Sequence, residues 1–273
     1  MITVSPIAGV IGAEVSGVDL ADVDDTTIKA IREAWLEHQV VFFRGQHLSA
    51  DQFLEFARSI GDLARYPFLP GIEGAPDIIA VTKLPHEQIN FGGIWHSDTA
   101  YLDEPPMATM LLAREVPAAG GDTMFASQYA AYDALSPAMK ELLAPLRAVN
   151  SSAMADVSKT REDRIRETEG DDLPSYEAVH PVVRTHPETG RKCLYVNVAH
   201  TARFDGMTEE ESRGLLQFLF QHQVKPEFTC RFHWEVGSLA LWDNRCVQHN
   251  PVNDYHGFKR VMHRITLQGD KPV

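Results

Sequence analysis

His96 and Asp98 are one residue apart, and they form the pair of side chains in this chain best suited to bind a metal ion. Side chains at positions i and i+2 of an extended strand point to the same face, so an imidazole and a carboxylate can converge there. A third donor, His249, lies much later in the chain. Two imidazoles and one carboxylate on one side of an iron leave the opposite positions open, which is typical of non-haem Fe(II) oxygenases.

An isolated His-x-Asp pair is more often structural, with the histidine packed in a strand and the aspartate in water. Residues 258–267 favour the functional interpretation, because they alternate between apolar and polar like a half-buried strand. This alternation places Arg260 and Arg264 on one face, with His263 on the other. Two guanidiniums on a buried face require anions, and arginine suits bidentate recognition of a carboxylate. The sequence therefore predicts an anion-binding site near His249.

Several ordered motifs resemble the taurine dioxygenase family, which also holds the 2,4-dichlorophenoxyacetate dioxygenases. The resemblance runs from residue 12 almost to the C-terminus. Its motifs are Trp-His-Ser-Asp at 95–98, Gly-Gly-Asp-Thr at 120–123, Trp-Asp-Asn-Arg at 242–245, Arg-Val-Met-His-Arg at 260–264 and Gly-Asp-Lys-Pro at 269–272.

The resemblance implies an oxidoreductase that uses Fe(II), 2-oxoglutarate and O2, with succinate and CO2 as coproducts. His96, Asp98 and His249 would hold the iron, and Thr123 and Arg260 would bind the far carboxylate of 2-oxoglutarate. The cofactor and cosubstrate carry the oxidation, while the protein supplies orientation and a dry pocket. We therefore expect a dioxygenase that hydroxylates a small anionic organic molecule.

The expected substrate pocket departs from that of the taurine enzymes at four positions. Tyr66, Leu69, Gly92 and His200 stand where those enzymes carry His, Tyr, Asn and Phe. Arg264 matches the arginine that receives the substrate's anionic group there. A site that hydrogen-bonds taurine would keep its polar partners, since each lost partner costs about 1–3 kcal/mol. A larger acid is therefore expected: a sulfonate, an alkyl sulfate or an aryloxyalkanoate.

Two other classes of protein fit the three metal-binding residues. Three protein ligands and a water also describe a zinc-dependent hydrolase, but Thr123 and Arg260 would then have no cosubstrate to bind. A non-catalytic ligand-binding jelly roll would use Arg264 for a sensory ligand.

The composition is that of an ordinary globular protein of 273 residues, 44% of them hydrophobic. The formal net charge of −13 and the lack of a Lys/Arg cluster speak against nucleic acid as a partner. Neither an apolar run of about 18 residues nor a signal-like N-terminus is seen, so we expect a cytoplasmic protein without membrane contact. Three widely spaced cysteines, Cys193, Cys230 and Cys246, are expected to be reduced. The expected assembly is a homo-oligomer, either a dimer or a tetramer.

The pattern of elements predicts a mainly β fold with flanking helices. Helices are expected at 26–39, from a cap at Ser49, at 129–135, from Ser136-Pro137, and from a capping box at Thr208 and Glu211. Strands are expected at 40–43, 107–113, 182–185, 193–197, 228–234, 239–242 and 260–267. We expect residues 1–273 to form one dioxygenase domain, a double-stranded β-helix (jelly roll, cupin-like). The strongly charged segment 153–177 is expected to be a solvated insertion or a lid over the active site.

Overall fold

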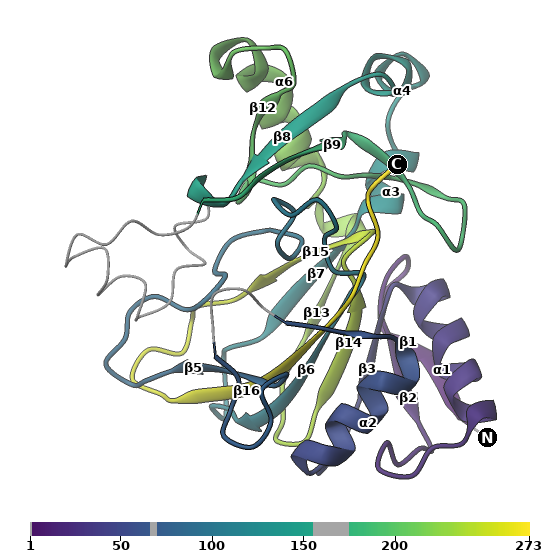
Figure 1. Cartoon of the computed structure of the whole chain (residues 1–273), viewed down its shortest axis with the longest axis vertical. Coiled ribbons are helices and arrows are strands. Elements are labelled where there is room, and N and C mark those ends of the chain that lie inside the picture. Colours follow the sequence, from purple (N-terminus) through teal and green to yellow (C-terminus); the bar gives the residue numbers. More distant parts are fainter. Residues whose placement is uncertain (1, 66–69, 155–174) are drawn as a thin grey trace.

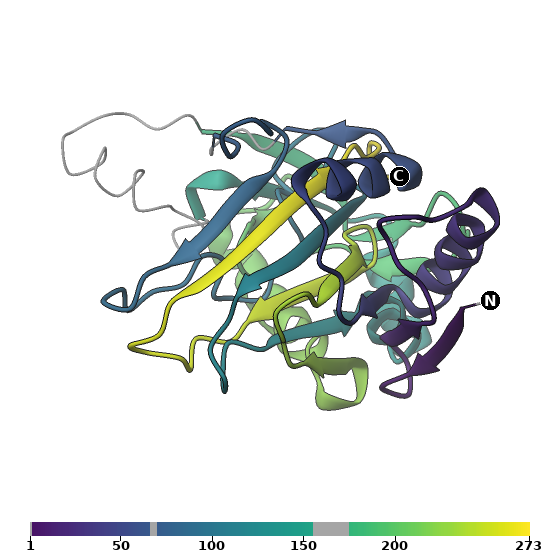
Figure 2. The ribbon, with the colours of Figure 1, turned by 90° about the horizontal axis from the view of Figure 1, so that it is seen from below.

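The largest sheet among the described residues has eight strands and carries several of the residues that line the site. The computed structural model describes residues 2–65, 70–154 and 175–273. The strand order is β1-β2-β3-β14-β6-β16-β4, and β5 also pairs with β16 (Figures 1 and 2). These strands are β1 (Thr3–Pro6), β2 (Ala13–Ser16), β3 (Val40–Phe43), β4 (Leu63–Ala64), β5 (Ile79–Lys83), β6 (Ala108–Glu115), β14 (Leu239–Asp243) and β16 (Arg260–Leu267).

A second sheet, β13-β7-β15, faces the inner side of the large one. Its strands are β7 (Thr123–Ser127), β13 (Thr229–Phe232) and β15 (Val247–Pro251). Side chains from both sheets interdigitate between them: Phe42 of β3 stacks on Phe232 of β13 with ring centroids 4.0 Å apart, and Met262 of β16 belongs to the same buried cluster. Two facing sheets closed around one core confirm the predicted jelly roll.

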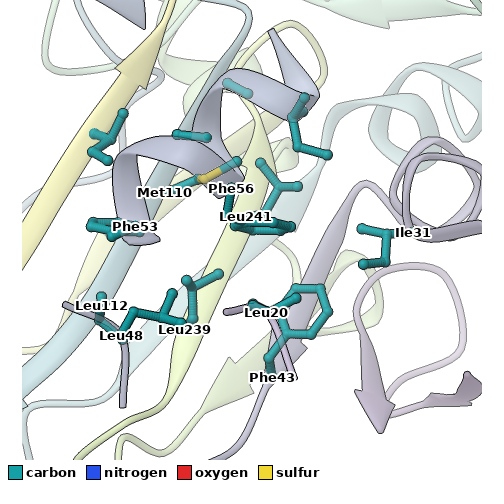
Figure 3. Close-up of a cluster of buried hydrophobic side chains, with 14 of the residues drawn as sticks. Leu20, Ile31, Phe43, Leu48, Phe53, Phe56, Met110, Leu112, Leu239 and Leu241 are labelled. Carbon is teal, nitrogen blue, oxygen red and sulfur yellow. The ribbon is translucent and has the colours of Figure 1, made fainter. Parts of the chain in front are cut away.

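Two helices cover the outer face of the large sheet. α1 (Asp25–His38) and α2 (Ala50–Ile60) lie on one side of it in Figure 1. Phe53 and Phe56 of α2 are buried against Met110 and Leu241 of the sheet, and Figure 3 shows this layer of side chains. Ser49 accepts a hydrogen bond from the backbone N–H of residue 52 in the predicted cap of α2. Burial of this apolar face is the main force that holds the helix on the sheet.

A third group of elements packs over one end of the jelly roll (Figure 1). It contains the three-stranded sheet β12-β8-β9, the hairpin β10-β11 and three helices around a separate apolar cluster. The elements are α3 (Gln128–Asp133), α4 (Pro137–Leu143), β8 (Arg147–Ser151), η1 (Ser152–Met154), β9 (Glu177–Pro181), β10 (Val183–Thr185), β11 (Lys192–Leu194), β12 (Thr201–Phe204), α6 (Glu209–His222) and η3 (Pro226–Phe228).

Most of the predicted helices and strands begin and end within two residues of their predicted bounds, and the caps at Ser136 and Thr208 are formed as predicted. Several strands were not predicted, among them β7 and β15, which carry Thr123 and His249. The strand predicted at 193–197 is shorter, because β11 stops at Leu194. Most of the predicted insertion or lid, together with Tyr66 and Leu69, lies outside the described residues. In the described part of the chain, no helix has the length and apolar character to cross a membrane.

Candidate metal centre and its surroundings

His96 and His249 are held side by side by their own backbones. His249 lies in β15, and His96 forms an isolated bridge to it, with His96 N donating to His249 O at 3.1 Å and His249 N donating to His96 O at 2.8 Å. The prediction that the His-x-Asp pair occupies an extended strand is wrong: the chain turns after the bridge, and Thr99 has a φ of +42°. Asp98 reaches the histidines from this turn.

The three side chains converge as a metal site requires. Oδ1 of Asp98 is 3.7 Å from Nε2 of His96 and 4.0 Å from Nε2 of His249. The three donor atoms all lie within 4.8 Å of one another, and all three residues are buried. Donor atoms at about 2.1 Å from a common ion are at most about 4.2 Å apart, so these two distances are compatible with one ion. The cluster is therefore suited to a divalent metal with open positions.

The protonation states favour the ligand form of each residue. Burial lowers the pKa of both His96 and His249, which keeps the imidazoles neutral. Nδ1 of His96 lies 2.7 Å from the carbonyl oxygen of Ile94 and donates to it, so Nε2 keeps its lone pair for an ion. Burial opposes ionisation of Asp98, but Arg264, the two histidines and the Thr109 hydrogen bond together outweigh it and hold the pKa of that carboxyl well below its usual range.

The other oxygen of Asp98 faces away from the two imidazoles. Oδ2 accepts a hydrogen bond from the Thr109 hydroxyl at 2.6 Å and lies 3.0 Å from Nη2 of Arg264. Neither contact is visible in the sequence pattern, because Thr109 follows Asp98 by eleven positions and lies in β6, and Arg264 lies in β16. Arg264 is thus placed against a candidate metal ligand as well as on the wall of the cavity.

Arg260 and Thr123 lie together, as predicted, on the same cavity as the histidines. Arg260 is 5% exposed, and Nε and Nη2 of its guanidinium have no hydrogen-bond partner among the described residues. Trp234 Nε1 donates to the Thr123 hydroxyl oxygen at 3.0 Å, which leaves the hydroxyl hydrogen of Thr123 for another acceptor. A buried cation and a free O–H donor form a cradle for a carboxylate.

The cavity has a volume of about 440 Å³, including its open mouth. Its walls combine the two arginines with apolar side chains such as Val81, Leu111 and Trp242. Gly92 also lines the cavity, with a φ of +70°, and a Cβ there would lie 2.9 Å from Cε1 of His96. The glycine is therefore close-packed against the Cε1–Nε2 edge of His96, whereas a glycine in place of the asparagine of the taurine enzymes was expected to make room for a larger acid.

His200 is not among the residues that line this cavity in the described part of the chain. It is buried with its ring centroid 6.0 Å from that of His96 and 4.9 Å from that of Tyr101. Burial lowers the pKa of His200 to about 3, so the ring is neutral. His200 thus lies close to a candidate metal ligand without lining the cavity.

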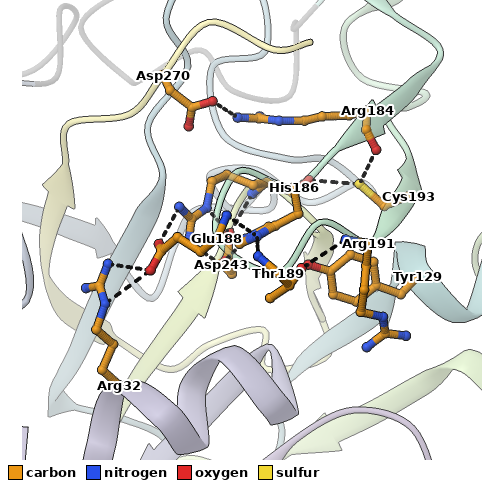
Figure 4. A network of polar contacts seen from close by, with 11 residues as sticks. Arg32, Tyr129, Arg184, His186, Glu188, Thr189, Arg191, Cys193, Asp243 and Asp270 are labelled. Atoms are coloured by element: carbon orange, nitrogen blue, oxygen red, sulfur yellow. Dashed lines mark hydrogen bonds and ion pairs between the residues drawn. The ribbon is translucent and has the colours of Figure 1, made fainter. Parts of the chain in front are cut away.

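A second group of potential metal-binding residues, His186, Asp243 and Cys246, was missed in the sequence. Nδ1 of His186 accepts from the backbone N–H of Glu188, so its Nε2–H donates to Asp243 Oδ2 at 3.0 Å. Both oxygens of Asp243 also accept hydrogen bonds from Arg245. Figure 4 shows these contacts as one network. The lone pairs of His186 and Asp243 are already used, so the network is structural.

Comparisons with known proteins agree with this geometry. The family described as "Taurine catabolism dioxygenase TauD, TfdA family" matches residues 3–266. An "Alpha-ketoglutarate-dependent sulfate ester dioxygenase" of Pseudomonas putida is 36% identical over 99% of this chain and 90% of its own length. An "Alkylsulfatase" of Acinetobacter baylyi is 35% identical over 97% of this chain and 84% of its own length.

Solved structures extend the agreement to the fold. A taurine dioxygenase from Burkholderia xenovorans superposes with a TM-score of 0.85 and 34% identity, covering 100% of this chain and 91% of that one. A structure of AAD-2 in complex with Mn(II) and N-oxalylglycine has a TM-score of 0.81 and 27% identity, covering 100% and 99%. The chain belongs to the taurine catabolism dioxygenase TauD, TfdA family and is an Fe(II)- and 2-oxoglutarate-dependent dioxygenase.

Proposed function

We propose that His96, Asp98 and His249 bind the Fe(II) of this enzyme and that Thr123 and Arg260 bind the far carboxylate of 2-oxoglutarate. The observation that carries the proposal is the buried guanidinium of Arg260, whose Nε and Nη2 have no partner among the described residues and which lines the same cavity as the two histidines. A buried unpaired cation is costly, and a dicarboxylate held between it and the metal would remove that cost.

The residues around the site have defined tasks in this reaction. When bound, the iron supplies the oxidation of a substrate C–H bond by O2, coupled to conversion of 2-oxoglutarate to succinate and CO2. Arg260 and Thr123 orient the cosubstrate through its far carboxylate, so that binding energy holds its reactive end in place. Trp242, Leu111 and Val81 keep the cavity apolar and limit the entry of water.

The substrate that the cavity supports best is a small organic anion with an apolar body, and we propose a sulfate ester. Arg264 would attract the anionic group while Gly92 borders its path to the metal, and the apolar walls would accept the alkyl chain. The names of two relatives, a sulfate ester dioxygenase and an alkylsulfatase, support this choice. Hydroxylation of the carbon that bears the sulfate oxygen gives a product that breaks into an aldehyde and inorganic sulfate.

Anaerobic titration with Fe(II) and 2-oxoglutarate tests the assignment of the site. The wild-type protein should develop a weak visible charge-transfer band, which only a chelated keto acid on iron produces. Asp98→Ala should abolish the band because the ion is lost. A protein that binds Zn(II) tightly but gives no band with Fe(II) would instead support a hydrolase.

A panel of acids tests the substrate. Succinate release is measured with hexyl sulfate, hexanesulfonate, phenoxypropionate and taurine at equal concentrations. We expect hexyl sulfate to be converted fastest, with release of inorganic sulfate. Taurine as the best substrate would contradict the proposal. Tyr66, Leu69 and His200 stay predicted contributors to this selectivity, and their alanine variants belong in the same panel.

We further propose that residues 1–273 act as one catalytic domain in a cytoplasmic homo-oligomer, without nucleic acid or membrane as a partner. The acidic net charge of −13 supports the absence of nucleic acid. Light scattering of the purified protein distinguishes a monomer from the expected dimer or tetramer.

A further inference from the structure

The two oxygens of Asp98 have different surroundings, and the difference can be traced through three further side chains. Oδ1 faces the imidazoles of His96 and His249, whereas Oδ2 accepts from the Thr109 hydroxyl at 2.6 Å and lies 3.0 Å from Nη2 of Arg264. Thr109 lies in β6 and is fully buried. A side chain that occupies one oxygen of a ligating carboxylate decides which oxygen remains for the ion.

The direction of each hydrogen bond behind Thr109 follows from the chemistry of Trp242. An indole N–H can only donate, and Trp242 Nε1 lies 2.9 Å from Oδ1 of Asn244, which fixes the orientation of the Asn244 amide. The NH2 group of Asn244 therefore points to Thr109 and donates to its oxygen at 2.9 Å. Because a hydroxyl has one hydrogen, Thr109 must use it to donate to Asp98 Oδ2.

The sheet sets the positions of these residues. Trp242 of β14 and Thr109 of β6 are cross-strand partners, and Asn244 follows directly at the end of β14. The ring of Trp242 also packs against that of His249, with centroids 4.7 Å apart. The backbone N–H of Asp98 lies 3.4 Å from Oδ1 of Asn244. The Trp-Asp-Asn-Arg motif thus contacts two of the three candidate ligands without contributing one.

We propose that Thr109, oriented by Asn244 and Trp242, is a positioning residue that restricts Asp98 to binding the metal through Oδ1 alone. A carboxylate that binds through one oxygen leaves more positions for a chelating keto acid and O2 than one that binds through two. The inference rests on the proposed role of Asp98 as a metal ligand. It assigns a task to three buried residues that do not contact the ion.

Replacement of the Thr109 hydroxyl by a methyl group tests the proposal. Thr109→Val keeps the shape and removes the hydrogen bond, and Mn(II) binding to the full chain is measured by electron paramagnetic resonance. We expect the Kd for Mn(II) to rise about 10- to 100-fold, as is usual for loss of such a supporting contact. Crystals grown with Mn(II) should show Asp98 bound through Oδ1 in the wild type and through both oxygens in Thr109→Val. Thr109→Ser keeps the donor and should restore both properties.

Thr266 offers a matched control. It lies opposite Thr109 in the neighbouring strand, it is also buried, and its hydroxyl has no hydrogen-bond partner in the part of the chain that is described. Thr266→Val should leave the Kd for Mn(II) unchanged. If Thr109→Val does not fold, Trp242→Phe is measured instead, since it keeps the ring and releases the Asn244 amide to turn over; it should weaken Mn(II) binding in the same direction.

Some outcomes would overturn the inference, and they can be told apart. Mn(II) affinity of Thr109→Val within about twofold of the wild type, with Asp98 still bound through Oδ1, would show that Thr109 does not position the carboxylate. Equal losses of Mn(II) affinity in Thr109→Val and Thr266→Val would mean that changed packing, and not loss of the hydrogen bond to Asp98, causes the effect. Binding of Mn(II) that Asp98→Ala leaves intact would instead remove the proposed metal site itself, and this inference with it.

Discussion

Gly92 lies so close to His96, the proposed metal ligand, that the imidazole leaves no room for a side chain. A Cβ would lie 2.9 Å from Cε1 and 3.3 Å from Nε2 of His96, and the φ of +70° is unfavourable for other residues. We expect Gly92→Ala to displace the imidazole and to raise the Kd for Fe(II) about tenfold or more, measured anaerobically.

Gly190 is the control for backbone strain in this experiment. It has a nearly equal φ of +68° but nothing within 4 Å of the Cβ position. Gly190→Ala should cost about 1–2 kcal/mol of stability and leave metal affinity unchanged. A similar loss of Fe(II) binding in both variants would mean that strain, and not contact with His96, is responsible.

The two arginines of β16 should separate by function. Arg260→Ala removes the buried cation of the carboxylate cradle, so the Kd for 2-oxoglutarate should rise roughly 10- to 150-fold, the equivalent of about 1.5–3 kcal/mol. Arg264→Ala should leave the Kd for 2-oxoglutarate unchanged. It should weaken metal binding, because Arg264 lies 3.0 Å from Asp98 Oδ2. Calorimetric titrations of both variants measure these constants. Equal increases of the Kd for 2-oxoglutarate in Arg260→Ala and Arg264→Ala would refute these separate roles.

The candidate site residues could be selected from the sequence because their types and spacing are unusual. The partners of Asp98 could not, since Thr109 and Asn244 are ordinary polar residues until the register of β6 against β14 brings them together. The extended strand predicted for His96 and Asp98 was wrong for a related reason. Only one residue of the pair is bridged to β15, and the left-handed Thr99 then turns the chain.

Among the elements, the turn after β14 is tied to α1 and to the β10-β11 hairpin through the buried Asp243–Arg245 pair. Arg245 donates to Glu188 in the hairpin at 2.8 Å, and Glu188 accepts from Arg32 of α1 (Figure 4). Asp243→Asn would leave Arg245 without its main counter-charge in a buried position. We expect a loss of about 3–5 kcal/mol in the free energy of unfolding, measured by urea denaturation.

The Arg65–Asp77 pair, whose arginine is exposed and whose aspartate is half-buried, provides the comparison for that variant. The Arg65 side chain is 77% exposed, so Asp77→Asn should change stability by less than about 1 kcal/mol. If Asp243→Asn were equally mild, the network would not hold these elements together. The hairpin and the helix could each be predicted from the sequence, but their connection depends on side chains far apart in the chain.

Across the whole molecule, buried histidines make stability depend on pH. His180 is 0% exposed, and burial lowers its pKa below the ordinary value near 6.5. The unfolded chain then binds more protons than the folded one below that value, so stability is fully present above pH 6.5 and falls as the pH drops. Metal-free protein should therefore unfold at lower urea at about pH 5 than at about pH 7.5, with at most about 1.4 kcal/mol per pH unit from each such histidine.

His180→Gln identifies the contribution of this residue. Glutamine can still donate to the carbonyl oxygen of Leu102, as His180 Nε2 does at 2.9 Å, but it does not titrate. The difference in stability between the two pH values should shrink in His180→Gln and stay as in the wild type in His86→Gln, at an exposed position. An unchanged difference in His180→Gln would contradict the sign argued above.

The jelly roll itself was predictable at this scale, since alternating strands and a helical layer leave few other arrangements. The third apolar cluster, which contains residues of β8, β12 and α6, was not predicted as a separate body, because short strands and helices do not reveal which partner they pack against.

The paired amides of His96 and His249 close a small ring of two hydrogen bonds between segments that the sequence keeps far apart. Both hydrogen bonds join main-chain atoms and involve no ion, so they hold the backbones of the two histidines side by side independently of iron binding. If iron is lost, the two histidines should therefore keep their arrangement and bind iron again. Deuterium should exchange slowly into those two amides both in the iron-bound and in the iron-free protein.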